Sequence, residues 1–96
     1  MKRFSVGDAE ATLFRALASL KNAEEARALF ADLCTPAEVK TMAQRLQIAE
    51  ALLNGETYEN IRTSHAVSSA TIARINAELQ YGNGGYKTVL ERMEKE

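Results

Sequence analysis

YENIRTSHAVSSATIARIN, residues 58–76, is the stretch of the sequence that decides the fold. It contains two short helical segments with a turn between them. A helix-turn-helix packs two short helices at a steep angle, so it needs apolar side chains inside the first helix, in the turn and on the inner face of the second. The residues at those offsets are Ile61, Val67, Ile72 and Ile75. The stretch therefore predicts a helix-turn-helix, which we place at residues 58–80.

The second helix of this segment has an apolar side and a small, polar side. Winding it at about 100° per residue brings Ile72, Ile75 and Leu79 within about 60° of one another. On the other side, small side chains let the backbone approach base edges, and hydroxyls near the helix N-terminus can hydrogen-bond phosphate or base. The candidate DNA-contact residues there are Ser68, Ser69, Ala70, Thr71, Ala73 and Arg74. An ordinary pair of packed core helices is the alternative interpretation.

Two residues depart from the usual pattern of this motif. The run Val67-Ser68-x-x-Thr71-Ile72-x-Arg74-Ile75 resembles the second half of helix-turn-helix segments in many bacterial repressors. Arg62, however, stands in the first helix where alanine is usual, and Ala66 stands where the turn usually has glycine. We therefore expect a turn that is not of the commonest kind.

The residues before this segment predict three amphipathic helices. Apolar residues three and four apart place the first at about residues 8–20. Asn22 and Glu25 form an N-cap and capping box for the second, which ends near Cys34. The third and longest is expected at about residues 36–54.

Thr35-Pro36-Ala37-Glu38 is the sharpest helix start in the chain. The threonine hydroxyl can accept an amide hydrogen bond, proline suits the first helical position, and the glutamate can return a bond to the cap. Gly55 supplies the left-handed residue that ends this long helix. Its expected inner face consists of Val39, Met42, Ala43, Leu46, Ala49, Leu52 and Leu53.

The remaining boundaries follow from caps and glycines. Thr57 and Ser68 cap helices expected at about residues 58–64 and 69–80. The run Gly82-Asn83-Gly84-Gly85 interrupts the helical pattern. A last amphipathic helix at about residues 86–94 carries Val89, Leu90 and Met93, and Tyr81 and Tyr86 are expected to anchor the break.

Length and composition predict one all-α domain, residues 1–96, which associates as a homodimer. The chain is 46% hydrophobic and 26% charged, and a domain of this size buries only roughly 60–65% of its unfolded surface, so a partner chain would help. The formal net charge of −1 weighs against a broad basic face. No apolar run is long enough to span a bilayer or to form a signal peptide, so we expect a cytoplasmic protein without membrane contact.

The sequence contains no pattern typical of an enzyme or a metal site. No nucleophile motif or phosphate loop occurs, so we expect neither catalytic residues nor a cofactor. His65 is the only histidine and Cys34 the only cysteine. We interpret His65 as partly buried packing without a metal partner, and Cys34 as a small core residue.

Read outward from the helix-turn-helix, the chain resembles the trp repressor family, in its trp-repressor-like branch. The resemblance covers about Leu33 to Leu79. The matching residues are Thr35, Pro36, Glu38, Arg45, Ile48, Glu50, Leu52, Leu53, Gly55, Glu56, Thr71, Ile72 and Arg74. It implies six helices per subunit and an intertwined homodimer in which the N-terminal helices pack on the partner. It also implies that the second helix of the motif docks in the DNA major groove, for which trp repressor is itself a standard example.

The resemblance further implies a candidate effector pocket at Thr35, Arg45 and Arg74. These residues match the family positions that hold tryptophan. Two neighbours differ from the tryptophan-binding member, because Ile75 replaces a glycine and Glu78 replaces a serine. The isoleucine fills space that an indole ring needs, so any small-molecule effector is expected to be other than tryptophan. An ion pair on the long helix is the alternative role for Arg45, and a surface salt bridge is the alternative for Arg74.

Two classes of function remain. The polar arc of the second helix favours a sequence-specific, DNA-binding transcriptional regulator, in particular a repressor, whose partner is double-stranded DNA. The near-neutral charge favours a helical protein-interaction or assembly module without DNA binding.

Overall fold

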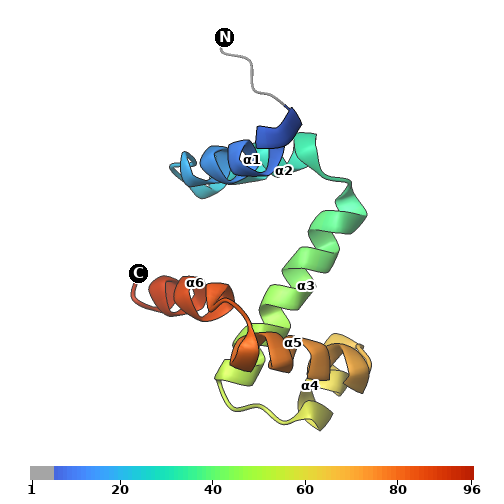
Figure 1. Cartoon of the computed structure of the whole chain (residues 1–96). Coiled ribbons are helices and arrows are strands. Elements are labelled where there is room, and N and C mark those ends of the chain that lie inside the picture. Colours follow the sequence, from blue (N-terminus) through green and yellow to red (C-terminus); the bar gives the residue numbers. More distant parts are fainter. Residues whose placement is uncertain (1–5) are drawn as a thin grey trace. The chain divides into compact units, whose positions relative to one another are not determined.

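The computed structural model describes residues 6–96, which form six α-helices and no strand (Figure 1). The all-α prediction is confirmed. A short 3-10 turn, Val6–Asp8, precedes the first helix. The helices are α1 (Ala9–Ala18), α2 (Ala23–Leu33), α3 (Pro36–Leu53), α4 (Tyr58–His65), α5 (Ser69–Tyr81) and α6 (Gly85–Glu94). No helix among these residues is both long and apolar enough to cross a membrane.

The chain divides into two compact units. The N-terminal unit extends to Val39 and the C-terminal unit begins at Lys40. Helix α3 starts in the first and ends in the second. The assignment of residues 1–96 to a single domain stays a prediction.

The starts of α2 and α3 depend on the predicted caps. Asn22 Oδ1 accepts a 2.9 Å hydrogen bond from the amide of Glu25, whose carboxylate accepts one from the amide of Lys21. Thr35 and Glu38 form a reciprocal capping box: Thr35 Oγ1 accepts from the Glu38 amide at 3.1 Å, and Glu38 Oε1 accepts from the Thr35 amide at 2.8 Å. Four otherwise unpaired donors are thereby satisfied.

Helix α3 ends at Leu53, and Gly55 beyond it is the left-handed residue that was predicted to stop the helix. The glycine has a φ of +82°, which places it in the left-handed region that glycine favours. Its amide donates to the carbonyl of Leu52, and the amide of Glu56 donates to that of Ala51. This pair of bonds is a Schellman motif, and it turns the chain out of the helix toward α4.

The buried residues of the described chain all lie in the C-terminal unit. Side chains from α3, α4, α5 and α6 form this core, in which Ile48, Ile61 and Ile72 expose no surface at all. Fully burying such a side chain contributes roughly 1.5–3 kcal/mol. The complete core consists of Ile48, Ala49, Ala51, Ile61, Ile72, Ile75 and Leu90, with Leu46, Leu52, Val67, Leu79 and Tyr86 packed against it.

The expected inner face of α3 is only partly right. Ala49 is buried as predicted, but Ile48 and Ala51 are buried as well, whereas Met42 and Leu53 are 37% and 42% exposed. Apolar side chains surround much of α3, so the side that is covered depends on where α4, α5 and α6 pack.

Three further expectations concern single side chains. Tyr81 was expected to anchor the glycine break and does not, because it is 85% exposed, whereas Tyr86 packs against the core. Cys34 and His65 are both half-buried. For His65 this agrees with the predicted partial burial, whereas Cys34 was expected in the core and does not belong to it.

Helices α1 and α2 contain no buried residue. The amphipathic pattern did predict both helices, yet their large apolar side chains remain open within the chain. Phe14 is 63% exposed, Leu33 55% and Leu13 37%. The apolar face of the N-terminal unit therefore lacks a cover within this unit.

Candidate nucleic-acid interface

Two capped helices and a tight turn form the candidate interface. Thr57 Oγ1 accepts a 3.2 Å hydrogen bond from the amide of Asn60 and so starts α4. Ser68 Oγ accepts one of 3.2 Å from the amide of Thr71 and so starts α5. Both caps were predicted, and both are of the kind in which a hydroxyl replaces a missing intrahelical acceptor.

The turn between the two helices contains a left-handed alanine. Ala66 ends α4 with a φ of 52° and a ψ of 47°, a conformation in which a Cβ is unfavourable by roughly 1–2 kcal/mol. The turn thus keeps, at Ala66, the backbone conformation for which glycine is usually chosen. Alanine in place of the usual glycine therefore adds strain to the turn but does not change its backbone conformation.

The second departure, Arg62, also leaves the packing of α4 against α5 intact. Its side chain is 50% exposed, and its Nη2 donates to both carboxylate oxygens of Glu59 at 2.8 Å. The guanidinium therefore lies on the outer surface of α4, bonded to its own helix. The inner position is filled by Ile61, which is fully buried.

The inner face of α5 agrees with the sequence prediction. Ile72 and Ile75 are 0% and 3% exposed, and Leu79 is partly buried against the same core. Val67 in the turn packs against this core as well. Since these four side chains point inward, the rotation of α5 about its own axis is fixed.

The opposite arc of α5 is open. Ser68, Ser69, Ala70, Ala73 and Arg74 are exposed, and Thr71 is half-buried. The hydroxyls of Ser68 and Thr71 lie 3.1 Å apart and share a hydrogen bond. Each hydroxyl keeps further capacity, since a hydroxyl offers one donor and two acceptor positions.

Two of the three candidate effector residues line one hollow. Arg45 of α3 and Arg74 of α5 both line it, together with Ile75, Glu78 and Tyr86. Thr35 is not among the lining residues and instead caps α3. An effector role for any of the three stays a prediction.

Sequence reasoning did not assign Tyr86 to this hollow. It follows the glycine break, and no local pattern indicates where α6 returns against α3 and α5. A second long-range contact was also missed: the side-chain amide of Gln44 donates to the carbonyl of His65 at 3.4 Å and ties α3 to the end of α4.

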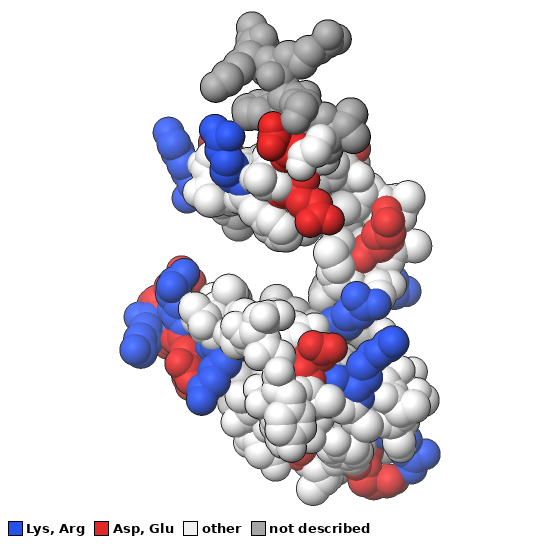
Figure 2. Space-filling model, viewed as in Figure 1, with Lys and Arg blue, Asp and Glu red and all other residues white. Residues whose placement is uncertain are grey.

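The charges of the C-terminal unit are mixed. On the face shown in Figure 2, Lys and Arg are interspersed with Asp and Glu, and several of the opposite charges lie side by side. This distribution accords with the formal net charge of −1. Attraction of DNA from a distance is therefore weak, and any binding here depends on short-range contacts.

Six helices, with two short capped ones joined by a tight turn, define the fold of a class of DNA-binding regulators. The chain belongs to the Trp repressor family, since the family model of the Trp repressor protein matches residues 10–94. This is a family of regulators and not of enzymes.

Relatives and solved structures agree with this assignment. The uncharacterized protein YerC of Bacillus subtilis is 43% identical over 83 residues, which are 86% of this chain and 80% of that protein. The crystal structure of a candidate Trp repressor from Staphylococcus aureus is 42% identical, with a TM-score of 0.83, over 92% of this chain and 88% of that one. A TrpR-like protein from Eubacterium eligens is 41% identical, with a TM-score of 0.84, over 91% and 90%.

Proposed function

We propose that this protein is a sequence-specific transcriptional repressor that binds double-stranded DNA as a homodimer, with the N-terminal half of α5 in the major groove. The observation that carries the proposal is the open arc of α5, where small and hydroxylated side chains surround a helix N-terminus. Free amides at such an N-terminus favour phosphate, and small side chains permit close approach to base edges. The contact residues are Ser68, Ser69, Ala70, Thr71, Ala73 and Arg74.

The homodimer is supported by the uncovered apolar face of the N-terminal unit. Phe14 and Leu33 are both more than half exposed, and burial of such side chains by a second copy contributes roughly 1.5–3 kcal/mol each. A two-fold dimer places two α5 helices about 34–36 Å apart, one turn of B-DNA, and then selects a palindromic site.

Selection from a random duplex library at low salt tests the proposal. The expected product is a palindrome whose half-sites lie about one helical turn apart. If the dimer is confirmed by sedimentation and selects no sequence, the repressor proposal is wrong.

Arg74 offers the sharpest single-residue test, because it is the long cationic side chain on the open arc. If Arg74 reads a guanine, Arg74→Ala should weaken the free energy of DNA binding by roughly 1–3 kcal/mol and relax specificity at one base pair per half-site. If Arg74 contacts phosphate, the variant's affinity should fall evenly over all DNA sequences. The slope of log affinity against log salt concentration should then shrink by about one. Thr88→Ala, on α6 and outside the proposed surface, is the control.

Tryptophan is not the effector in this proposal. Ile75 is 3% exposed and packed into the core beside the hollow that Arg45 and Arg74 line. An indole ring there would have to displace a close-packed side chain. Calorimetry is expected to show no tryptophan binding at micromolar concentration, and heat of binding in that range would overturn this part.

The second candidate is a helical protein-interaction module. The mixed surface charge and the net charge of −1 favour it, because DNA-binding domains usually carry a basic footprint. A dimer that selects no duplex would make this the better interpretation.

A further inference from the structure

A polar hollow of the C-terminal unit, the α3–α4 hollow, lies between α3 and the end of α4. Its lining contains one lysine, one histidine and no carboxylate. The polar lining residues are Lys40, Thr41, Gln44, Gln47, Ser64 and His65. In a chain with a formal net charge of −1, a hollow with an ammonium group and no acid is a favourable place for an anion.

The charge of Lys40 is not balanced by its own helix. Residues three and four positions apart share a side of a helix, and around Lys40 these are Pro36, Ala37, Ala43 and Gln44. None of them is acidic, and no carboxylate of the described residues forms an ion pair with Lys40. Lys40 is also exposed, so its ammonium group is available to an external anion.

The other polar groups of the α3–α4 hollow suit an anion as well. The side-chain amide of Gln44 donates to the carbonyl of His65 at 3.4 Å. This bond covers the carbonyl of the last residue of α4, where the negative end of the helix would otherwise face the hollow. Gln47 and Ser64 are exposed, and each offers a side-chain donor to an oxyanion.

The α3–α4 hollow lies at the edge of the proposed DNA-binding surface. His65 ends α4 and Ser68 caps α5, and three chain steps of about 3.8 Å keep their Cα atoms within about 11 Å of each other. The major groove is about 12 Å wide, so an α5 helix bound in the groove brings the end of α4 close to the phosphates that border it. In helix-turn-helix proteins the first helix crosses the DNA backbone, which agrees with this placement.

We propose that the α3–α4 hollow holds one backbone phosphate of the bound DNA, with Lys40 as its charged contact and Gln47 and Ser64 as donors beside it. The assignment rests on the proposed DNA-binding function and adds to it an anchor that reads no base. Phosphate contacts supply much of the affinity of DNA-binding proteins, whereas the open arc of α5 offers one long cationic side chain, Arg74. A free phosphate ion shares the chemistry of the backbone phosphate, and the experiment separates these two sources.

The slope of log affinity against log salt concentration, measured for the full chain and the selected operator, tests this assignment. Lys40→Gln is expected to flatten the slope by about 0.9 per subunit, the value for one neutralised phosphate of B-DNA. Its affinity should fall by the same factor for every duplex sequence. Lys40→Arg keeps the charge and should keep the wild-type slope. Lys87→Gln removes the same charge on α6, outside the hollow, and should behave as the wild type.

Four outcomes would overturn the assignment. Two of them are a wild-type slope in Lys40→Gln and an equal change in Lys87→Gln, which would indicate a general effect of charge. The third is a loss confined to one base pair of the operator, because a phosphate contact carries no sequence information.

The fourth outcome concerns free phosphate. Inorganic phosphate at millimolar concentration, compared with chloride of equal ionic strength, is expected to leave the wild-type affinity for DNA unchanged. If phosphate competes with DNA in the wild type but not in Lys40→Gln, the hollow holds the free ion and the assignment to the DNA backbone is wrong.

A duplex of unrelated sequence separates this proposal from the repressor proposal. Phosphate contacts form on any sequence, so Lys40→Gln should flatten the salt slope on this duplex too. If no palindrome is selected while the slope still flattens, the repressor proposal fails and the phosphate contact stands. If a palindrome is selected and Lys40→Gln binds it as the wild type does, the phosphate contact fails and the repressor proposal stands. Protein that binds no duplex at all refutes both.

Discussion

The two units of this chain use the same element, the amphipathic helix, with opposite results. In the C-terminal unit, α3 to α6 bury seven residues in one core. In the N-terminal unit, α1 and α2 have apolar stripes, and α2 has a side-chain cap as well, but neither helix buries a residue. A helix is thus specified by its own sequence, whereas a core requires enough apolar surfaces that face one another. Helices as short as α1 (10 residues) and α2 (11 residues) are marginal in water on their own, so their apolar stripes need a cover.

The largest expected effect is on the core of the C-terminal unit. Ile72→Ala removes a side chain with no exposed surface, and the cavity left behind should lower the free energy of unfolding by about 2–5 kcal/mol. Urea denaturation measures this loss. Ile72→Val, the control, should lose about 0.5–1.5 kcal/mol. A loss below 1 kcal/mol in the alanine variant would show that the core is not closely packed there.

The next largest effect is expected on dimer association, which tests whether a second copy covers the open face of the N-terminal unit. Phe14→Ala removes a ring that is 63% exposed in the single chain. If the ring is buried in a dimer, the substitution removes about 1.5–3 kcal/mol of burial free energy per copy. This loss weakens association at least tenfold. Sedimentation over a range of concentrations measures it.

Tyr81→Ala is the matched control for that experiment. Tyr81 is 85% exposed and belongs to the C-terminal unit, so its loss should leave association unchanged. Equal association of Phe14→Ala and wild type would remove the dimer explanation for the difference between the units.

A smaller effect concerns the backbone of the C-terminal unit. Ala66→Gly removes a Cβ from a left-handed position and should raise the free energy of unfolding by about 1 kcal/mol. Ala77→Gly, within α5, should lower it by a similar amount, because glycine is unfavourable in a helix interior. Opposite signs in thermal unfolding would support the strained turn, and equal signs would contradict it.

The smallest effect is the pH dependence of the capping box in the N-terminal unit. The backbone N–H of Thr35, and after it the Thr35 hydroxyl, hold the pKa of Glu38 below its ordinary value of 4.5. A lowered pKa in the folded state means that this stabilisation is present above pH 4.5 and is lost as the pH falls through the folded pKa.

Urea denaturation at a series of pH values measures this dependence. Glu38→Gln keeps an acceptor oxygen but cannot titrate, so it should lose less stability on acidification than the wild type. Thr35→Ala keeps the backbone bond, the larger cause of the shift, and should retain most of the dependence. Identical profiles for Glu38→Gln and wild type would show that the cap does not contribute.

The features that the sequence predicted are those decided within a few residues. The caps at Asn22, Thr35, Thr57 and Ser68 each bond an amide three residues ahead, so their chemistry is visible locally. The inward face of α5 was predicted for the same reason, since a helical repeat fixes which side chains share a side.

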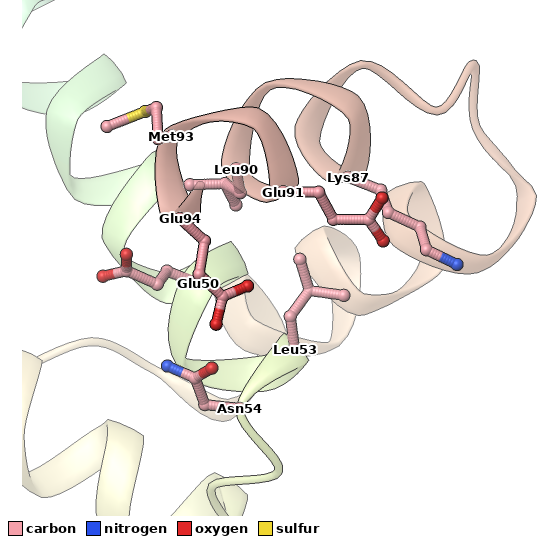
Figure 3. Close-up of a pocket in the computed structure, with 8 residues that line it drawn as sticks. All are labelled: Glu50, Leu53, Asn54, Lys87, Leu90, Glu91, Met93 and Glu94. Atoms are coloured by element: carbon pink, nitrogen blue, oxygen red, sulfur yellow. The ribbon is translucent and has the colours of Figure 1, made fainter. Parts of the chain in front are cut away.

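The features that were missed depend on contacts between distant segments. Ile48 and Ala51 are buried because α4, α5 and α6 cover that side of α3, and periodicity within α3 does not say which side that is. The hollow of Arg45, Arg74 and Tyr86 joins three helices. Figure 3 shows a second hollow, between two distant helices, lined among others by Glu50 and Leu53 of α3 and by Leu90 and Glu94 of α6.

The position of the buried residues along the chain also affects how the protein is made. Ile48 is the first core residue in the sequence and Leu90 is the last. At a synthesis rate of roughly 5–20 residues per second, they leave the ribosome several seconds apart. Until Leu90 emerges the core cannot close, although Leu13 and Phe14 are already outside. During synthesis, the nascent chain therefore presents uncovered apolar helices to chaperones and to neighbouring chains on the same messenger RNA before it has a core of its own.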